Sequence, residues 1–123
     1  MNIAEFSIAR LPHIHFGAGV FSRTAGICSK FGRRLLIVTG AQSFQQSPYR
    51  IELEAELTNQ HIDWRYFRIA AEPSPELIDQ AVKQFADDDI DLVLGIGGGS
   101  ALDAAKAIAG LRKPQTPVMD YLE

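Results

Sequence analysis

The chain has 123 residues, of which 46% are hydrophobic, and a formal net charge of −3. This length supports one hydrophobic core rather than two complete domains, and the slightly negative charge gives no reason to expect nucleic acid or an anionic membrane as a partner. No apolar run reaches membrane-spanning length and the N-terminus lacks a signal-peptide pattern, so we expect a cytoplasmic protein with no membrane partner.

Strand-like and helix-like segments alternate along the chain. In order, the patterns predict a β-hairpin over residues 6–16, a helix over 20–31 that Gly32 ends, a strand over 35–38, a helix from Pro48, a strand over 63–69, a helix from Pro75 with Ser74 as its cap, a strand over 92–96 and an Ala-rich helix over 101–111. Short loops between these segments predict a Rossmann-like α/β fold, in which a parallel sheet carries helices on both faces.

Three features outside these patterns bear on the core and the surface. Cys28 is the single cysteine, which excludes an internal disulfide, and it falls on the apolar face of the first predicted helix, so we expect it in the core. The acidic run 87–91 is expected to be a solvated loop. His13 and His15 would share one face of an extended segment, as metal ligands can, but no third ligand is evident and a hairpin surface is the plainer interpretation.

A glycine-rich turn over residues 95–100 joins the last predicted strand to the last helix. The first N–H groups of a helix have no partner and carry partial positive charge, so the amides of Gly98 and Gly99 are candidates to hold a phosphate, with the Ser100 hydroxyl as a further donor. Alternatively, the glycines serve only a tight turn and Ser100 caps the helix. The dinucleotide fingerprint G-x-G-x-x-G is not satisfied, and no Gly-Lys-Ser/Thr follows as in nucleotide triphosphatases.

The position of this turn agrees with where such folds bind ligands. Open parallel sheets bind them beyond the carboxyl ends of the strands. The loop that begins at Gly40, the loop 72–74 and the glycine turn all follow predicted strands, so we expect them to line one edge of the sheet.

The spacing Gly-Gly-Gly-Ser-x-x-Asp-x-x-Lys over residues 97–106 resembles that of the metal-dependent, or iron-containing, alcohol dehydrogenase family. Weaker matches follow in the family's order: a hairpin end Phe-Gly-x-Gly at 16–19, a strand at 34–40, a Pro-x-Pro turn at 73–75 and the segment after the glycine helix at 117–121. The resemblance covers essentially the whole chain, and the glycine motif is its specific part.

The resemblance implies an oxidoreductase that interconverts an alcohol and an aldehyde or ketone, with NADP or NAD as cofactor and a divalent metal, iron or zinc. The family holds that metal in a second, helical domain, and no residue here matches its ligands. We therefore expect residues 1–123 to be a single dinucleotide-binding domain with no catalytic or metal-binding residue and little turnover alone. A surface left uncovered by the missing domain would favour a homo-oligomer. The alternatives are a glycerol dehydrogenase or dehydroquinate synthase type of domain, and a non-catalytic nucleotide-binding module.

The candidate cofactor-binding residues are Gly40, Gly97, Gly98, Gly99, Ser100 and Asp103. Many family members have aspartate where Gly40 stands, and an acid there binds the adenosine ribose and repels a 2′-phosphate, so its absence favours NADP(H). Asp103 would repel a phosphate at the helix start. The spacing alone favours a capping role for it, whereas the resemblance implies that it reaches toward the nicotinamide or the substrate. Ser74 stands where the family often has asparagine, although its cap role is sufficient.

Overall fold

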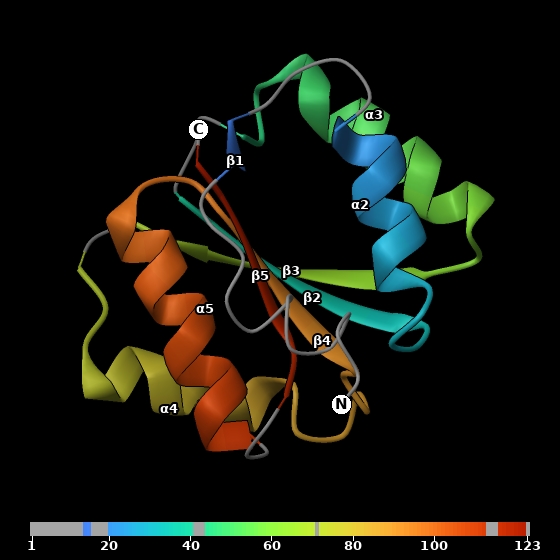
Figure 1. The fold of residues 1–123 in the computed structure, drawn as a ribbon. Coiled ribbons are helices and arrows are strands. Elements are labelled where there is room, and N and C mark those ends of the chain that lie inside the picture. Colours follow the sequence, from blue (N-terminus) through green and yellow to red (C-terminus); the bar gives the residue numbers. More distant parts are fainter. Residues whose placement is uncertain (1–13, 16–19, 41–43, 71, 113–115, 123) are drawn as a thin grey trace.

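The computed structural model describes residues 14–15, 20–40, 44–70, 72–112 and 116–122. The elements are β1 (Ile14–His15), α2 (Val20–Cys28), β2 (Arg34–Gly40), α3 (Pro48–Asn59), β3 (Asp63–Ile69), α4 (Pro75–Gln84), β4 (Leu92–Ile96), α5 (Gly99–Arg112) and β5 (Val118–Leu122). They form a 5-stranded sheet in the order β1-β5-β4-β2-β3, in which neighbouring strands run parallel and helices lie on both sides (Figure 1).

This architecture confirms the predicted α/β fold, with two qualifications at the edge of the sheet. β5 was not among the predicted elements. Of the predicted N-terminal hairpin, the structure describes only Ile14 and His15, which pair in parallel with Tyr121 and Leu122 of β5. The remainder of that hairpin lies outside the described residues.

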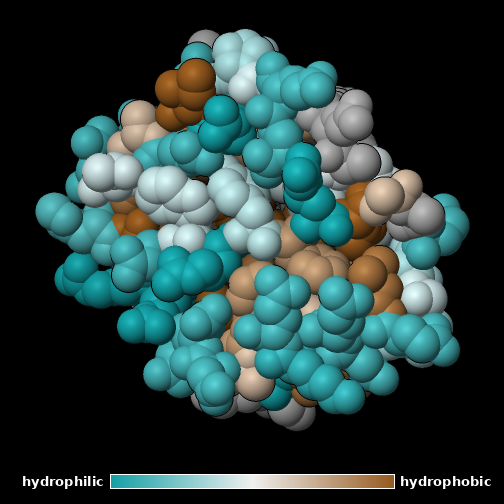
Figure 2. Space-filling model, turned by 180° about the vertical axis from the view of Figure 1, so that it is seen from behind, coloured by the Kyte–Doolittle hydropathy of each residue, from teal (hydrophilic) through white to brown (hydrophobic). Residues whose placement is uncertain are grey.

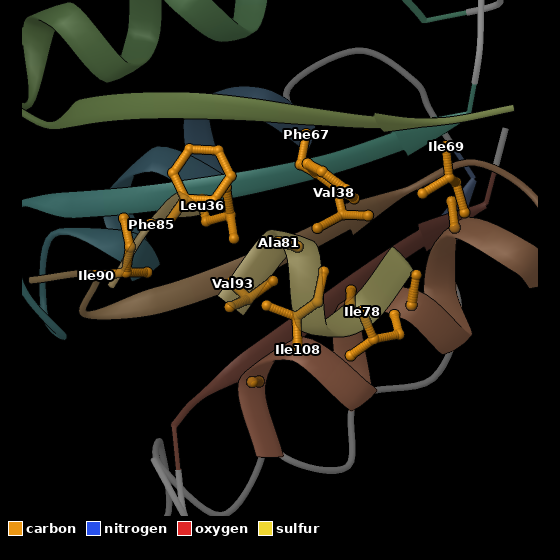
Figure 3. Close-up of a cluster of buried hydrophobic side chains, with 14 residues drawn as sticks. Leu36, Val38, Phe67, Ile69, Ile78, Ala81, Phe85, Ile90, Val93 and Ile108 are labelled. Atoms are coloured by element: carbon orange, nitrogen blue, oxygen red, sulfur yellow. The ribbon is translucent and has the colours of Figure 1, made fainter. Parts of the chain in front are cut away.

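The central strands are apolar over most of their length because helices cover both faces of the sheet. All 5 residues of β4 are buried, as is the middle of β2. Leu35 and Ile37 belong to a core shared with α2 and α3, whereas Leu36 and Val38 belong to a core shared with α4 and α5. Figure 3 shows this second core, with Leu36 and Val38 directed from the sheet toward the helices.

The direction in which the chain moves across the sheet changes after β3. β3 lies on one side of β2 and β4 lies on the other side. The helices that follow β2 and β4, α3 and α5, consequently cover opposite faces (Figure 1). Such a switch leaves a crevice at the carboxyl ends of the two strands, which is where open α/β sheets bind their ligands.

Two helices begin with a serine cap followed by proline, and of these caps the sequence predicts the one at Ser74. The backbone N–H of Leu77 donates to Ser74 Oγ at 3.1 Å, and Pro75 follows as the first residue of α4. The N–H of Tyr49 donates in the same way to Ser47 Oγ at 3.0 Å before α3. These side-chain oxygens satisfy donors that the helix itself leaves free.

The acidic run 87–91 is not simply a solvated loop, which corrects the prediction. Asp91 Oδ2 accepts hydrogen bonds from the backbone N–H of Arg33 at 2.8 Å and of Arg34 at 3.1 Å. The carboxylate lies against Gly32, where a Cβ on that residue would stand. Asp91 therefore holds the turn between α2 and β2, a role that no local pattern indicates because its partners are 58 and 57 residues away.

The outer surface is mainly polar. Figure 2 shows the molecule from behind, where hydrophilic and pale residues make up most of the face and brown residues are confined to smaller areas. Among the described residues, the large hydrophobic side chains that are strongly exposed are Ile51 and Leu111. None of the described helices has both the length and the apolar character that crossing a membrane requires.

Cys28 fills the core as predicted, and this burial changes its ionisation. Its side chain is fully buried, with Sγ 3.9 Å from Met119 Sδ, and desolvation raises the pKa of the thiol from 9.0 to about 12. Above pH 9 the unfolded chain releases this proton while the folded chain keeps it. The free energy of unfolding should therefore fall by about 1.4 kcal/mol per pH unit between about pH 9 and pH 12.

Urea denaturation of the reduced chain and of Cys28→Ala checks this expectation. Between about pH 8 and pH 10.5, the loss of unfolding free energy should be about 2 kcal/mol smaller in the variant, because it lacks the shifted group. An equal loss in both chains would show that the thiol contributes nothing to the pH dependence.

Candidate functional site

A pocket of about 320 Å³ lies at the carboxyl ends of the strands. Its lining is Gly40, Ile69, Ala70, Glu72, Gly98, Gly99, Ser100 and Ala101. The ends of β2 and β3 and the turn after β4 thus meet at one place, as their positions after strands predict. The pocket brings together most of the candidate cofactor-binding residues, although they are separated by up to 60 residues in sequence (from Gly40 to Ser100).

The three consecutive glycines of the turn differ in what requires them. Gly97 is buried and has a φ of 139°, a conformation that side chains disfavour, so the backbone itself requires glycine there. Gly98 and Gly99 have no such φ, and a Cβ built on either would meet nothing within 4 Å. A tight turn therefore accounts for Gly97 alone. Because Gly98 and Gly99 have no side chains, their backbone is open to the pocket.

The helix begins at these open glycines. The N–H of Leu102 donates to the Gly98 carbonyl at 3.2 Å, which makes Gly98 the cap and Gly99 the first residue of α5. The N–H groups of Gly99, Ser100 and Ala101 have no carbonyl one turn earlier to accept from them, and they lie at the positive end of the helix dipole. The lining residues of the pocket thus include a set of backbone donors suited to an anion.

Ser100 does not cap the helix, so the capping interpretation is wrong. It is the second residue of α5, which begins earlier than the pattern suggests because the Gly98 carbonyl accepts the first helical bond. Asp103 consequently lies beyond the first turn and cannot form the reciprocal cap with Ser100. Asp103 is exposed and is not part of the pocket lining, so its predicted reach toward the nicotinamide or the substrate stays a prediction.

Glu72 is a pocket residue that the sequence did not single out. Its Oε1 accepts a hydrogen bond from Ser100 Oγ at 2.9 Å. Among the described lining residues it is the only charged one, so the pocket holds a carboxylate and no described lysine or arginine. The sequence placed the loop 72–74 near the site, but the contact joins residues 28 positions apart and has no local signal.

Two neighbouring hydroxyl groups have different environments. Ser74, which stands where the family often has asparagine, is engaged as the cap of α4 and is not part of the pocket lining. Thr39 directly precedes Gly40, and its Oγ1 is fully buried without a hydrogen-bond partner among the residues that the structure describes. A buried hydroxyl without a partner costs stability.

The part of the chain that the structure describes contains no group of three or more His, Cys, Asp or Glu side chains that could hold a metal ion. These residues therefore do not fit the metal that the resemblance implies. His13 lies outside the described residues, and the side chain of His15 is not described, so the interpretation of this pair as hairpin surface is untested.

The chain is similar in sequence to known alcohol dehydrogenases. A family model described as iron-containing alcohol dehydrogenase matches residues 12–123. The chain is 33% identical to NADH-dependent butanol dehydrogenase A of Clostridium acetobutylicum, over 78% of this chain and 25% of that protein. It is also 33% identical to long-chain-alcohol dehydrogenase 1 of Geobacillus thermodenitrificans, over 94% of this chain and 30% of that protein.

A solved structure agrees in fold. The crystal structure of an iron-containing alcohol dehydrogenase from Thermotoga maritima matches with a TM-score of 0.77 and 28% identity, over 90% of this chain and 36% of that chain. The present chain spans about a quarter to a third of the length of the curated relatives named above.

Proposed function

Because this chain belongs to the iron-containing alcohol dehydrogenase family, we propose that its pocket binds the diphosphate of NADPH or NADH at the start of α5. The observation that carries the proposal is the pair Gly98 and Gly99. Neither backbone conformation nor packing requires glycine at these positions, yet both are bare where a helix presents unpaired amides to a pocket.

The bound diphosphate would accept hydrogen bonds from the N–H groups of Gly99, Ser100 and Ala101, strengthened by the positive end of the α5 dipole. The adenosine ribose would lie toward Gly40, at the end of β2, where this class of sheet holds that sugar. The cofactor, when bound, supplies or accepts the hydride. The protein's own contribution here is to position the cofactor, since no described residue of the pocket is a proton donor or acceptor except Glu72 and Ser100.

The reaction we propose for the protein that carries this domain is the interconversion of an alcohol and an aldehyde. Butanol and long-chain alcohols, named for the two curated relatives, are the first substrates to test. No step is assigned to a metal, because the described residues include no cluster that could hold one.

Calorimetric titration of the chain with NADH, NADPH and ADP tests the proposal. Saturable binding of all three is expected, because each carries the diphosphate that the start of α5 would hold. The absence of saturable binding for every one of these ligands would overturn it.

Cofactor choice is expected to depend on position 40. Gly40 is not acidic and a Cβ there would meet nothing within 4 Å, which leaves room for a 2′-phosphate. We expect NADPH to bind at least as tightly as NADH, and Gly40→Asp to shift the ratio of the two affinities toward NADH by about tenfold, since its carboxylate would bind the ribose hydroxyls and repel the phosphate. Much tighter binding of NADH by the unchanged chain would refute this role of Gly40.

A further inference from the structure

We propose that Glu72 is a built-in competitor of the ligand phosphate, and that it limits how tightly and how long the pocket holds its dinucleotide. This inference rests on the proposed function of the pocket. It begins from the contact between Ser100 Oγ, in the first turn of α5, and Glu72 Oε1, in the loop before α4, which are 2.9 Å apart.

The Ser100 hydroxyl has one proton to donate, and in this structure the proton is directed to Glu72. A phosphate held at the first amides of α5 would lie beside that hydroxyl, because Ser100 is the second residue of the helix. The hydroxyl can donate to the phosphate only after it gives up the carboxylate. Ligand binding therefore exchanges one charge-assisted hydrogen bond for another and gains less than a free hydroxyl would provide.

The charge of Glu72 acts in the same direction. No described lysine or arginine lines the pocket, so no side chain in the described lining offsets the repulsion between this carboxylate and a phosphate a few ångströms away. Glu72 is exposed, and water screens part of this repulsion. The effect is therefore moderate: it weakens the binding of an anion without excluding it.

Weaker binding suits a site whose ligand must leave in every catalytic cycle. Release of a product or spent cofactor limits the turnover of many enzymes, and a carboxylate that reclaims the Ser100 hydroxyl stabilises the empty pocket. Glu72 would thus be a positioning residue that acts through Ser100.

The test compares Glu72→Gln, which keeps the shape of the side chain and removes its charge, with Glu52→Gln, which makes the same change of net charge on an exposed part of α3. Titration with ADP and NADH at low salt should give about fivefold tighter binding for Glu72→Gln and no change for Glu52→Gln. The gain should shrink at about 0.5 M salt, where charges are screened, and stopped-flow measurement should show slower release of NADH.

A second comparison tests the exchange of the hydroxyl. Ser100→Ala should weaken ADP binding more in a Glu72→Ala background than in the unchanged chain, because only there is the hydroxyl free for the phosphate. Equal effects in both backgrounds, or no gain from Glu72→Gln, would overturn the competition while the proposed function stands. Weaker NADH binding in Glu72→Gln would show instead that the carboxylate accepts a ligand hydroxyl. If neither ADP nor NADH binds the unchanged chain, the proposed function fails and this inference fails with it.

Discussion

Replacement of Gly99 by valine is expected to weaken NADH and ADP binding by about 100-fold or more while the fold stays intact. The valine methyl groups would fill the space in front of the first amides of α5, where the phosphate is proposed to lie. Within the protein itself a Cβ on Gly99 meets nothing within 4 Å, so we expect the fold to accept the side chain. Calorimetric titration measures the affinity, and urea denaturation should show a free energy of unfolding within about 0.5 kcal/mol of the unchanged chain.

Gly110→Val is the matched control for this prediction. Gly110 is an exposed glycine of the same helix, with equally open space around a Cβ, and it lies about 16 Å farther along the helix axis. Its replacement should leave ligand affinity unchanged. Undiminished binding in Gly99→Val would place the phosphates away from the glycine turn, and equal losses in both variants would indicate a general effect of valine on α5.

Gly32→Ala is expected to lower the free energy of unfolding by about 2–4 kcal/mol. Gly32 has a φ of 150°, which side chains disfavour, and its missing Cβ makes room for the Asp91 carboxylate. The backbone N–H groups of Arg33 and Arg34 donate hydrogen bonds to that carboxylate at 2.8 and 3.1 Å, and an alanine methyl group would displace the carboxylate from them. Urea denaturation monitored by circular dichroism provides the measurement.

Two further variants separate the causes. Gly26→Ala, in helix α2, has open space around its Cβ and should raise stability by about 0.5–1 kcal/mol through helix propensity. Asp91→Ala removes the group that clashes with the new methyl group. The double variant should therefore lose less free energy of unfolding than the sum of the losses in Gly32→Ala and Asp91→Ala. Simple additivity would mean that backbone strain alone, and not the carboxylate, makes Gly32 necessary.

Resemblance and local pattern together predict residues that the structure brings into one pocket. The family suggested by the spacing over residues 97–106 is confirmed by a match over residues 12–123. The structure brings Gly40, Gly98, Gly99 and Ser100 to one pocket because each follows or ends a parallel strand, and those ends share one edge of the sheet.

Two predictions from the sequence differ from the structure, one at the start of α5 and one at the strand β5. The assignment of Ser100 as a cap was wrong because the helix starts at Gly99, a shift that propensity does not resolve. The strand β5 was missed, although Val118 pairs with Val93 of the buried strand β4. The segment is short and Asp120 interrupts its apolar residues, so its strand character becomes evident only from its pairing with β4.

By itself, the sequence determined the alternation of strands and helices, the start of α4 at the Ser74 cap and Pro75, the buried position of Cys28 and the place of the glycine turn. These features depend on interactions between residues a few positions apart, or on the periodic spacing of apolar side chains. Both can be recognised from the sequence alone. Only the tertiary structure decided that Glu72 holds the Ser100 hydroxyl and that Asp91 holds the turn before β2. A hydrogen bond reaches about 3 Å, so which carboxylate meets which donor is settled only when the strands have brought distant loops together.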